Sequence, residues 1–362
     1  MDDRKGTLYP GQRLRARGAA TNASGRFEPE SREGFADDWD IPEDDRLIRT
    51  ETRLERPRSA ITWQKSPDLP FDRSINPYRG CEHGCIYCYA RPSHAFLNLS
   101  PGLDFETRLI ARPGIAEVLA KEIARPSYKV APIAIGTNTD PYQPIDGTHG
   151  LMRQILQVLA DHHHPVWITT RGTLIERDID LIASMAAQRL ASVSISITTL
   201  DAGLARRMEP RAPAPKRRLD IIRNLAAAGI PVRVQVSPLI PALTDHELEA
   251  VLEAAATAGA THATSIPLRL PREVAGLFRD WIEATFPDRA ARVMGRVREL
   301  HGGRDYDPAF GVRMTGQGIW ADLIRRRLDI ARKRLGLMRG LPALRTDLFG
   351  VPPRAGDQLS LF

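Results

Sequence analysis

Apolar residues recur along the middle of the chain in two alternating patterns. Short runs rich in Val, Ile, Ser and Thr are followed by longer stretches in which apolar residues recur every three or four positions. The first pattern is typical of buried strands and the second of amphipathic helices. The predicted strands cover residues 74–78, 129–136, 166–170, 191–198, 232–237 and 261–269. The helical patterns that follow them cover residues 115–123, 151–159, 175–185, 219–226, 248–255 and 274–281.

Six strand-then-helix units in succession predict an α/β fold with a parallel sheet and right-handed crossovers. We therefore assign residues 46–285 to one core domain. In folds built from such units, side chains with chemical roles lie at the carboxyl ends of the strands. The segments directly after each predicted strand are thus the first places to look for a functional site.

Two regions flank this core. No Val, Ile, Leu or Met occurs between Arg15 and Asp40, so residues 1–45 are predicted to be a disordered N-terminal extension. Helical patterns at 289–300 and 322–338 predict a helical C-terminal region over residues 286–340, followed by a flexible tail at 341–362. The last helix carries a basic face, for which a solvated surface is favoured over phosphate contact. That face consists of Arg325, Arg326, Arg327, Arg332, Lys333 and Arg334.

Composition and charge narrow the protein class. Hydrophobic residues make up 42% of the 362 residues, as in a soluble globular protein, and no apolar run is long enough for a membrane helix. The first ten residues, MDDRKGTLYP, have no apolar core of a signal peptide, so we expect a cytoplasmic protein without a membrane partner. The net charge of +7 permits a nucleic-acid partner, although an arginine-rich solvated surface explains it equally well.

All three cysteines of the chain lie in one motif, Cys81-x3-Cys85-x2-Cys88. Thiolates are soft ligands for iron–sulfur clusters or zinc. A structural zinc site would need a fourth ligand, either His83 or His94, and the chain has no second cysteine pair of the kind that zinc sites use. The odd number of cysteines argues against a disulfide framework. A four-iron cluster is favoured, and three cysteines leave one of its irons open for another ligand.

The motif C-x3-C-x-aromatic-C, in which Tyr87 is the aromatic residue, resembles the signature of the radical S-adenosylmethionine (SAM) superfamily. The longer runs NPYRGC (76–81) and CYARP (88–92) resemble the branch related to spore photoproduct lyase. Within that branch the chain is similar, from about Arg17 to Phe362, to a bacterial group whose substrate is not assigned. The resemblance implies a partial, TIM-like (βα)6 barrel.

The same resemblance implies the activity and the cofactors. The expected protein is a radical SAM enzyme that binds a [4Fe-4S] cluster through Cys81, Cys85 and Cys88 and binds SAM at the open iron. It would cleave SAM reductively to a 5′-deoxyadenosyl radical, with electrons from a donor such as flavodoxin or ferredoxin. The alternatives are a radical SAM enzyme acting on a protein or a metabolite, and a non-catalytic, clamp-associated metal-binding protein.

The loop after the second predicted strand is a candidate site for the methionyl ammonium group of SAM. The superfamily often has a Gly-Gly-Glu-like run there, whereas this chain has oxygen-bearing side chains at Thr137, Asn138 and Asp140. An ammonium group needs hydrogen-bond acceptors, so these residues are the candidates. The alternative for this loop is an ordinary Asp-Pro turn.

Three more SAM contacts follow from the resemblance. Arg171, directly after the third predicted strand, is a candidate partner of the SAM carboxylate, and so is Arg211 after the fourth strand. A plain salt bridge between Arg211 and Glu209 is equally consistent with the sequence. Ser196 lies on the small, polar face of the fourth strand and is a candidate contact for the ribose or carboxylate of SAM.

The substrate is open at this point. Spore photoproduct lyase uses an additional cysteine as a hydrogen donor, whereas all three cysteines here are assigned to the cluster, so its reaction is not transferred to this chain. The last residues, from Gln358 to Phe362, resemble the peptide with which bacterial repair proteins bind the DNA sliding clamp; packing on the protein's own barrel is the alternative. Basic charge, kinship and tail together suggest a nucleic-acid substrate and a role like DNA repair.

Overall fold

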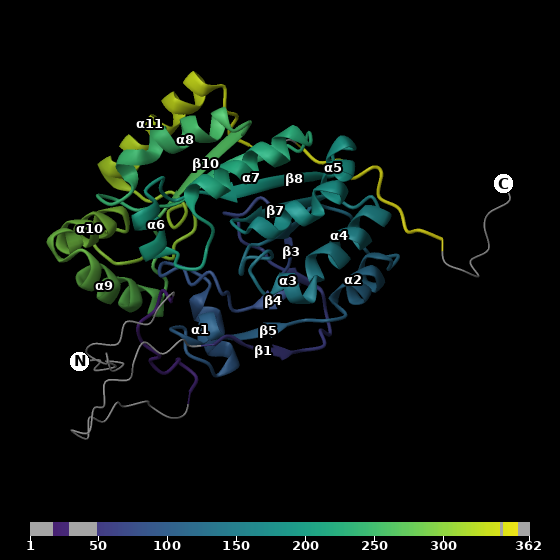
Figure 1. The fold of residues 1–362 in the computed structure, drawn as a ribbon, viewed down its shortest axis with the longest axis horizontal. Helices are drawn as coiled ribbons and strands as arrows, with labels where there is room; N and C mark the ends of the chain where they lie inside the picture. Colours follow the sequence, from purple (N-terminus) through teal and green to yellow (C-terminus); the bar gives the residue numbers. More distant parts are fainter. Residues whose placement is uncertain (1–16, 29–48, 341–342, 354–362) are drawn as a thin grey trace.

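The computed structural model of the chain describes residues 17–28, 49–340 and 343–353 (Figure 1). In this part of the chain a seven-stranded sheet forms the centre, with the strand order β10-β9-β8-β7-β6-β3-β2. All neighbouring pairs are parallel except the last, in which β2 (Ile61–Trp63) is antiparallel to β3. The parallel strands are β3 (Arg73–Ile75), β6 (Ile133–Ile135), β7 (Val166–Thr170), β8 (Ala191–Ser196), β9 (Val232–Leu239) and β10 (His262–Pro267).

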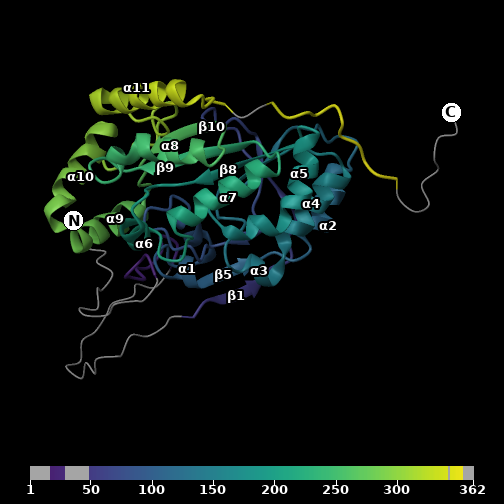
Figure 2. The same ribbon diagram turned by 45° about the horizontal axis from the view of Figure 1, so that its top comes forward.

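Each parallel strand is followed along the chain by a helix. The helices after all strands but β10 lie along the outside of the curved sheet, as Figures 1 and 2 show, whereas the helix after β10 packs beside the cysteine loop. The helices are α2 (Ile115–Ile123), α4 (Leu151–Asp161), α5 (Ile179–Ala187), α7 (Pro215–Ala227), α8 (Leu248–Thr257) and α9 (Glu273–Thr285). Strand β8 is buried at all six positions because it has helices on one side and the barrel interior on the other. The end strands β2 and β10 do not pair with each other, so the barrel is partial. The predicted α/β fold is confirmed.

The chain around the first strand differs from the prediction of one strand over 74–78. Strand β3 ends at Ile75, and Pro77 lacks the N–H that a central strand would need. The chain then crosses to β4 (Tyr78–Arg79), which belongs to a second sheet with the order β1-β5-β4. Its other strands are β1 (Glu51–Leu54) and β5 (Arg108–Ala111). The pattern of the sequence missed β1 because it is exposed at all four positions and has no apolar alternation.

Short helices fill the connections. They are η1 (Arg91–Leu97), α1 (Asp104–Thr107), α3 (Asp146–His149), η2 (Thr173–Asp178), α6 (Ala202–Met208) and η3 (Asp245–Glu247). Helix α6 begins at an Asp201 side chain that accepts hydrogen bonds from the Gly203 and Leu204 amides.

Residues 17–28 differ from the predicted disorder of residues 1–45. The buried carboxylate of Glu106 in α1 accepts hydrogen bonds from the amides of Gly18 (2.9 Å) and Ala19 (2.8 Å). The same carboxylate binds the guanidinium of Arg91 at 2.5 Å. Hydrogen bonds to backbone amides therefore hold this segment. The hydrophobic pattern did not predict its order because these contacts do not depend on apolar side chains. The remaining parts of the predicted extension lie outside the described residues.

The C-terminal region is helical, as predicted for residues 286–340. It contains α10 (Pro287–Leu300) and α11 (Gly318–Leu335), and Figure 2 shows α11 lying across α8 and β10. The predicted basic face is only partly free. Arg332 is buried and binds Asp329, and Arg327 forms an ion pair with Glu249 (2.5 Å).

After α11 the chain returns to the sheet. Met338 forms a single bridge beside β10: its carbonyl accepts from the Ala263 amide (3.0 Å) and its amide donates to the Thr261 carbonyl (2.9 Å). Its side chain is exposed, although the helical pattern predicted from the sequence extended to this residue. The predicted clamp-binding peptide from Gln358 to Phe362 lies outside the described residues. In the part of the chain that the structure describes, no helix has the length and apolar character needed to span a membrane.

Candidate functional site

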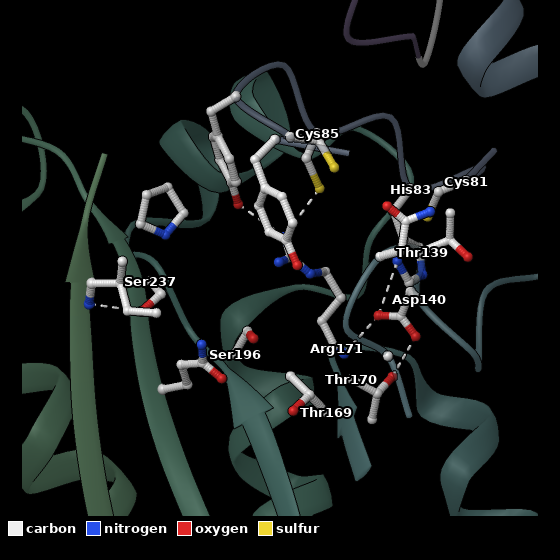
Figure 3. Close-up of a pocket in the computed structure, with 18 of the residues that line it drawn as sticks. Cys81, His83, Cys85, Thr139, Asp140, Thr169, Thr170, Arg171, Ser196 and Ser237 are labelled. Atoms are coloured by element: carbon white, nitrogen blue, oxygen red, sulfur yellow. Dashed lines mark hydrogen bonds and ion pairs between the residues drawn. The ribbon is translucent and has the colours of Figure 1, made fainter. Parts of the chain in front are cut away.

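A pocket lies where the carboxyl ends of the parallel strands meet the cysteine loop (Figure 3). The pocket is partly open to solvent. Each strand from β6 to β10 contributes to its wall, through Asp140, Arg171, Ser196, Ser237 and Pro267 in turn. The strand register explains why these side chains meet, because Thr170 at the end of β7 lies opposite Ile195, next to Ser196. The site therefore lies at the carboxyl ends of the strands, where reactive groups are found in parallel α/β folds.

The three cysteines all line this pocket. Burial raises the pKa of each thiol, for Cys85 to about 12 even though the nearby Arg171 lowers it. Buried thiols of this kind become thiolates only when a metal replaces the proton. The pocket thus collects three soft ligands in one place.

The two histidines that could complete a zinc site already face other groups. Among the described residues, no three His, Cys, Asp or Glu side chains converge closely enough to share one metal ion. His94 places Nε2 2.9 Å from the Arg108 carbonyl, and His83 directs Nδ1 at Asp140, 3.4 Å away. A four-iron cluster needs only one thiolate per iron, so its ligands surround a group of atoms instead of one point. A cluster on the three cysteines leaves both histidines with these partners, whereas tetrahedral zinc would require one of them to turn away.

A buried ionic network lies directly behind the cysteine loop. The Arg171 Nη1 group donates to Cys85 Sγ (3.0 Å), to the Tyr87 hydroxyl (2.8 Å) and to Glu209 Oε1 (2.9 Å). Burial tends to raise the pKa of Glu209, but the guanidinium groups of Arg218 and Arg171 bring it to about 2. The carboxylate is therefore ionised, and it holds Arg171 against a cysteine sulfur.

Asp140 organises the loop after β6. Its carboxylate accepts hydrogen bonds from the Thr170 hydroxyl (2.5 Å), the Arg171 amide (2.9 Å) and the Tyr142 amide (3.0 Å). Burial raises its pKa, but His83 and these hydrogen bonds outweigh it and lower the pKa to about 2. Both oxygens have protein partners, so Asp140 ties the ends of β6 and β7 together.

The close approach of these two strand ends requires glycine at position 136. Gly136 has φ +85°, and a Cβ added there would lie 1.9 Å from the Thr169 carbonyl oxygen. The glycine therefore allows the loop that carries Asn138 and Asp140 to pack directly against β7.

The structure brings together most of the residues predicted for SAM. Asn138, Asp140, Arg171 and Ser196 line the pocket with the three cysteines. Thr137 is not part of the lining, and its carbonyl accepts from the Tyr89 hydroxyl. Arg211 also lies outside the lining, and it pairs with Glu82 at 3.1 Å rather than with Glu209, the alternative that the sequence left open. The partner of Glu209 on the following helix is Arg218, which the sequence reasoning missed.

One buried acceptor in the pocket has no protein partner. Gln235 on β9 lines the cavity, and its Oε1 makes no hydrogen bond with the described residues. An unpaired buried acceptor is costly unless a ligand satisfies it. A bound molecule with N–H or O–H donors, such as the adenine and ribose of SAM, fits this position.

Sequence reasoning also missed Arg269, which lines the pocket directly after β10. Its guanidinium carbon lies 5.3 Å from the ring centre of Tyr89 and 5.9 Å from that of Tyr306. Its Nε atom is buried without a hydrogen-bond partner among the described residues. The available signal was its place at the carboxyl end of the sixth predicted strand.

Solved structures with a similar fold include spore photoproduct lyase. Its complex with dinucleoside spore photoproduct superimposes with a TM-score of 0.58 and 15% sequence identity, over 80% of this chain and 81% of that chain. A cysteine-to-serine mutant of the lyase matches with a TM-score of 0.57 over the same shares. At this identity the likeness shows a shared fold only.

Sequence comparisons show the family. Residues 75–255 match the Radical SAM superfamily. Uncharacterized protein Rv2578c of Mycobacterium tuberculosis is 41% identical over 242 residues, which is 66% of this chain and 70% of that protein. Uncharacterized protein MJ0683 of Methanocaldococcus jannaschii is 27% identical over 173 residues, which is 48% of this chain and 62% of that protein. These matches show that the chain belongs to the radical SAM superfamily of enzymes, for which a [4Fe-4S] cluster and SAM are the implied cofactors.

Proposed function

We propose that this radical SAM enzyme holds its cluster on Cys81, Cys85 and Cys88, binds SAM in the pocket beneath them and acts on nucleic acid. The observation that carries the proposal is the pocket that these cysteines share with the strand ends and with the unpaired acceptor of Gln235. The cofactor pair, when bound, supplies reductive cleavage of the sulfonium and a 5′-deoxyadenosyl radical for hydrogen abstraction.

The chain's own residues bind and orient the cofactors. Arg171, fixed by Glu209, donates to Cys85 Sγ. Asn138 and Ser196 remain the proposed contacts of the SAM ammonium and ribose, and Gln235 is added as an acceptor for the adenine or ribose. The buried Tyr87 closes the wall behind the cysteines and limits the access of water.

Three observations support a nucleic-acid substrate. The chain carries a net charge of +7. Arg269 lines the pocket and has no carboxylate partner among the described residues. The fold is shared with a lyase whose solved complex holds a dinucleoside photoproduct. We propose damaged DNA as the substrate, in a role like DNA repair.

The cofactor part is tested by reconstitution with iron and sulfide without oxygen, followed by dithionite and SAM. We expect a [4Fe-4S] absorption and EPR spectrum and formation of 5′-deoxyadenosine. Both should be lost in Cys85→Ala and kept in Ser184→Ala, a surface change on α5. Stoichiometric zinc, or no 5′-deoxyadenosine from a fully loaded cluster, would contradict this part.

The substrate part needs a separate experiment. Ultraviolet-irradiated DNA, untreated DNA and a peptide and metabolite extract are each added to the loaded enzyme with SAM. We expect irradiated DNA to increase 5′-deoxyadenosine and to exchange hydrogen with it, measured by deuterium transfer from labelled DNA. Stimulation by the extract alone would show that the substrate is a protein or a metabolite.

A further inference from the structure

We propose that Arg91 positions the cysteine loop for the cluster, and that a segment from before the first strand keeps this arginine in place. The cysteine loop comprises residues 81–88. The segment comprises residues 17–24, and we call it the N-terminal strap. Figure 1 shows the strap, in purple, beside α1. The inference rests on the proposed cluster and adds the strap to the parts of the chain that hold it.

The side chain of Arg91 is fully buried and binds the backbone of the cysteine loop. Its Nε atom donates to the Cys85 carbonyl (2.9 Å), and its Nη2 atom donates to the Gly84 carbonyl (3.2 Å). Its Nη1 atom donates to the carbonyls of Pro101 (3.1 Å) and Gly102 (2.9 Å). Because the guanidinium is a rigid, planar fork of donors, these bonds fix the backbone around a proposed cluster ligand.

The charge of this buried guanidinium is balanced by Glu106 in α1. Glu106 Oε1 lies 2.5 Å from Arg91 Nη2, and neither side chain is exposed. The same carboxylate accepts hydrogen bonds from two strap amides, those of Gly18 (2.9 Å) and Ala19 (2.8 Å). Displacement of the strap would remove both hydrogen bonds and open the ion pair to water, which weakens it. The strap therefore stabilises the arginine that holds the loop.

The strap also touches the cysteine loop directly, at Gly18. A Cβ added to Gly18 would lie 1.7 Å from the Gly84 carbonyl oxygen, which is an acceptor of Arg91, and 3.3 Å from Arg91 Nη2. The φ of Gly18 lies outside the left-handed region, so glycine is required here by space alone. The strap backbone is thus packed against the part of the loop between its first two cysteines.

The other end of the strap is anchored at the start of α1. The Asn22 Nδ2 group donates to Asp104 Oδ1 (2.8 Å), and the Asp104 amide donates to Asn22 Oδ1 (3.0 Å). The Thr21 carbonyl accepts from the Leu103 amide (3.1 Å). These contacts hold the strap on the short helix that carries Glu106. The strap is therefore fixed at both ends, to the loop and to the helix behind it.

This arrangement has a specific consequence for a bound cluster. Three thiolates retain a cluster only while the backbone between them keeps its shape, and groups around the ligands set their orientation. A displaced strap would free the carbonyls that Arg91 holds and expose the outer side of the loop to water. The loop would then open locally more often while the barrel stays folded. Iron would leave a loaded cluster faster for the same reason.

The first measurement is hydrogen exchange of the full chain before cluster loading, followed by mass spectrometry of the peptide that covers residues 81–88. We expect Gly18→Ala to speed exchange there about tenfold, because the new Cβ pushes the strap off Gly84 and breaks its bonds to Glu106. Gly295→Ala is the matched control: this exposed position on α10 has nothing within 4 Å of an added Cβ, so exchange should equal that of the wild type.

The second measurement is the release of iron from the loaded protein to a ferrous chelator without oxygen. We expect Gly18→Ala to release iron about tenfold faster than the wild type, and Gly295→Ala to release it at the wild-type rate. Asn22→Ala loosens the far end of the strap and adds no atom near the loop. It should also speed both exchange and release, and it decides the case if Gly18→Ala does not fold.

The outcomes separate this inference from the proposed function. If Gly18→Ala and Asn22→Ala match the wild type in loop exchange and iron release, the strap does not position the loop, and the cluster assignment stands. An equal rise of exchange in β7, β8 and β9 would mean a general loss of stability and would contradict a positioning role. If the wild type takes up no cluster, the proposed function fails, and loop exchange alone decides whether the strap holds the loop.

Discussion

The contact between Arg171 and Cys85 joins the ionic network to the proposed cluster ligands. A charged donor 3.0 Å from a ligand sulfur stabilises the more negative, reduced form of a cluster. Glu209 holds the guanidinium in place from behind. Its Nη1 group contacts the sulfur, Tyr87 and Glu209, while the binding of the SAM carboxylate by Arg171 stays a prediction for its other guanidinium nitrogens. We therefore propose that the arginine positions Cys85 and tunes the cluster.

We predict that Arg171→Gln lowers the midpoint potential of the reconstituted cluster. A difference of about 1.4 kcal/mol between the two oxidation states corresponds to about 59 mV for a one-electron couple. The measurement is a redox titration followed by EPR, and Arg153→Gln, a change at the exposed Arg153–Asp180 pair, is the control. An unchanged or higher potential would mean that Arg171 leaves the sulfur when the cluster is bound.

At the scale of elements, the site depends on how tightly β6 and β7 end against each other. The Gly136 backbone contacts the Thr169 carbonyl, and Asp140 then bonds to Thr170 and to the Arg171 amide. The loop that follows β6 thus contacts Thr169 and Thr170 at the end of β7 and Arg171 directly after it. Any change that separates the two strand ends would displace Asn138 and Arg171 together.

We predict that Gly136→Ala destabilises the protein more than Gly150→Ala. Both glycines have positive φ, so each substitution costs about 1–2 kcal/mol of backbone strain. A Cβ at 136 also meets the Thr169 oxygen at 1.9 Å, whereas one at 150 meets nothing within 4 Å. The clash adds about 1–3 kcal/mol, measured as the free energy of urea unfolding. Equal losses would show that the backbone at 136 relaxes freely.

For the whole molecule, His164 makes stability depend on pH. Burial lowers the pKa of His164 to about 4, and its ring nitrogens bond to the Tyr128 hydroxyl (2.8 Å) and the Pro165 carbonyl (3.0 Å). The folded state therefore keeps the neutral ring at pH values where the unfolded chain, with the ordinary pKa of 6.5, takes up a proton. Stability is full above pH 6.5 and is lost as the pH falls towards 4.

We predict that the unfolding free energy drops by on the order of 3 kcal/mol between pH 7 and pH 4 through this residue. His164→Gln should reduce that slope by the share of this residue, since glutamine does not titrate, whereas His94, whose pKa burial also lowers to about 4, keeps its own share. His163→Asn at the exposed neighbouring position should leave the slope unchanged. Urea unfolding at several pH values is the measurement. A slope as steep in His164→Gln as in the wild type would show that His164 does not contribute to the acid sensitivity.

Most of the barrel could be predicted from the sequence because each strand-then-helix unit buries apolar residues at regular spacing. Strand β7 was predicted with its observed bounds, and the helices after each parallel strand were all present. The small sheet was missed because β1 is exposed and β4 has two residues. The candidate site followed from the cysteine spacing and the strand ends, but the direction of Arg211 towards Glu82 depends on tertiary contacts that local pattern does not contain.

The return of the chain to the outer side of β10 has a consequence for solubility. Met338 occupies one donor and one acceptor at Ala263 and Thr261, on the side of β10 that has no neighbouring strand. A polypeptide shortened to end before this residue would leave that edge with unsatisfied amide and carbonyl groups, a template on which another copy can add a strand. Such a truncation should form oligomers and precipitate even while its barrel remains folded.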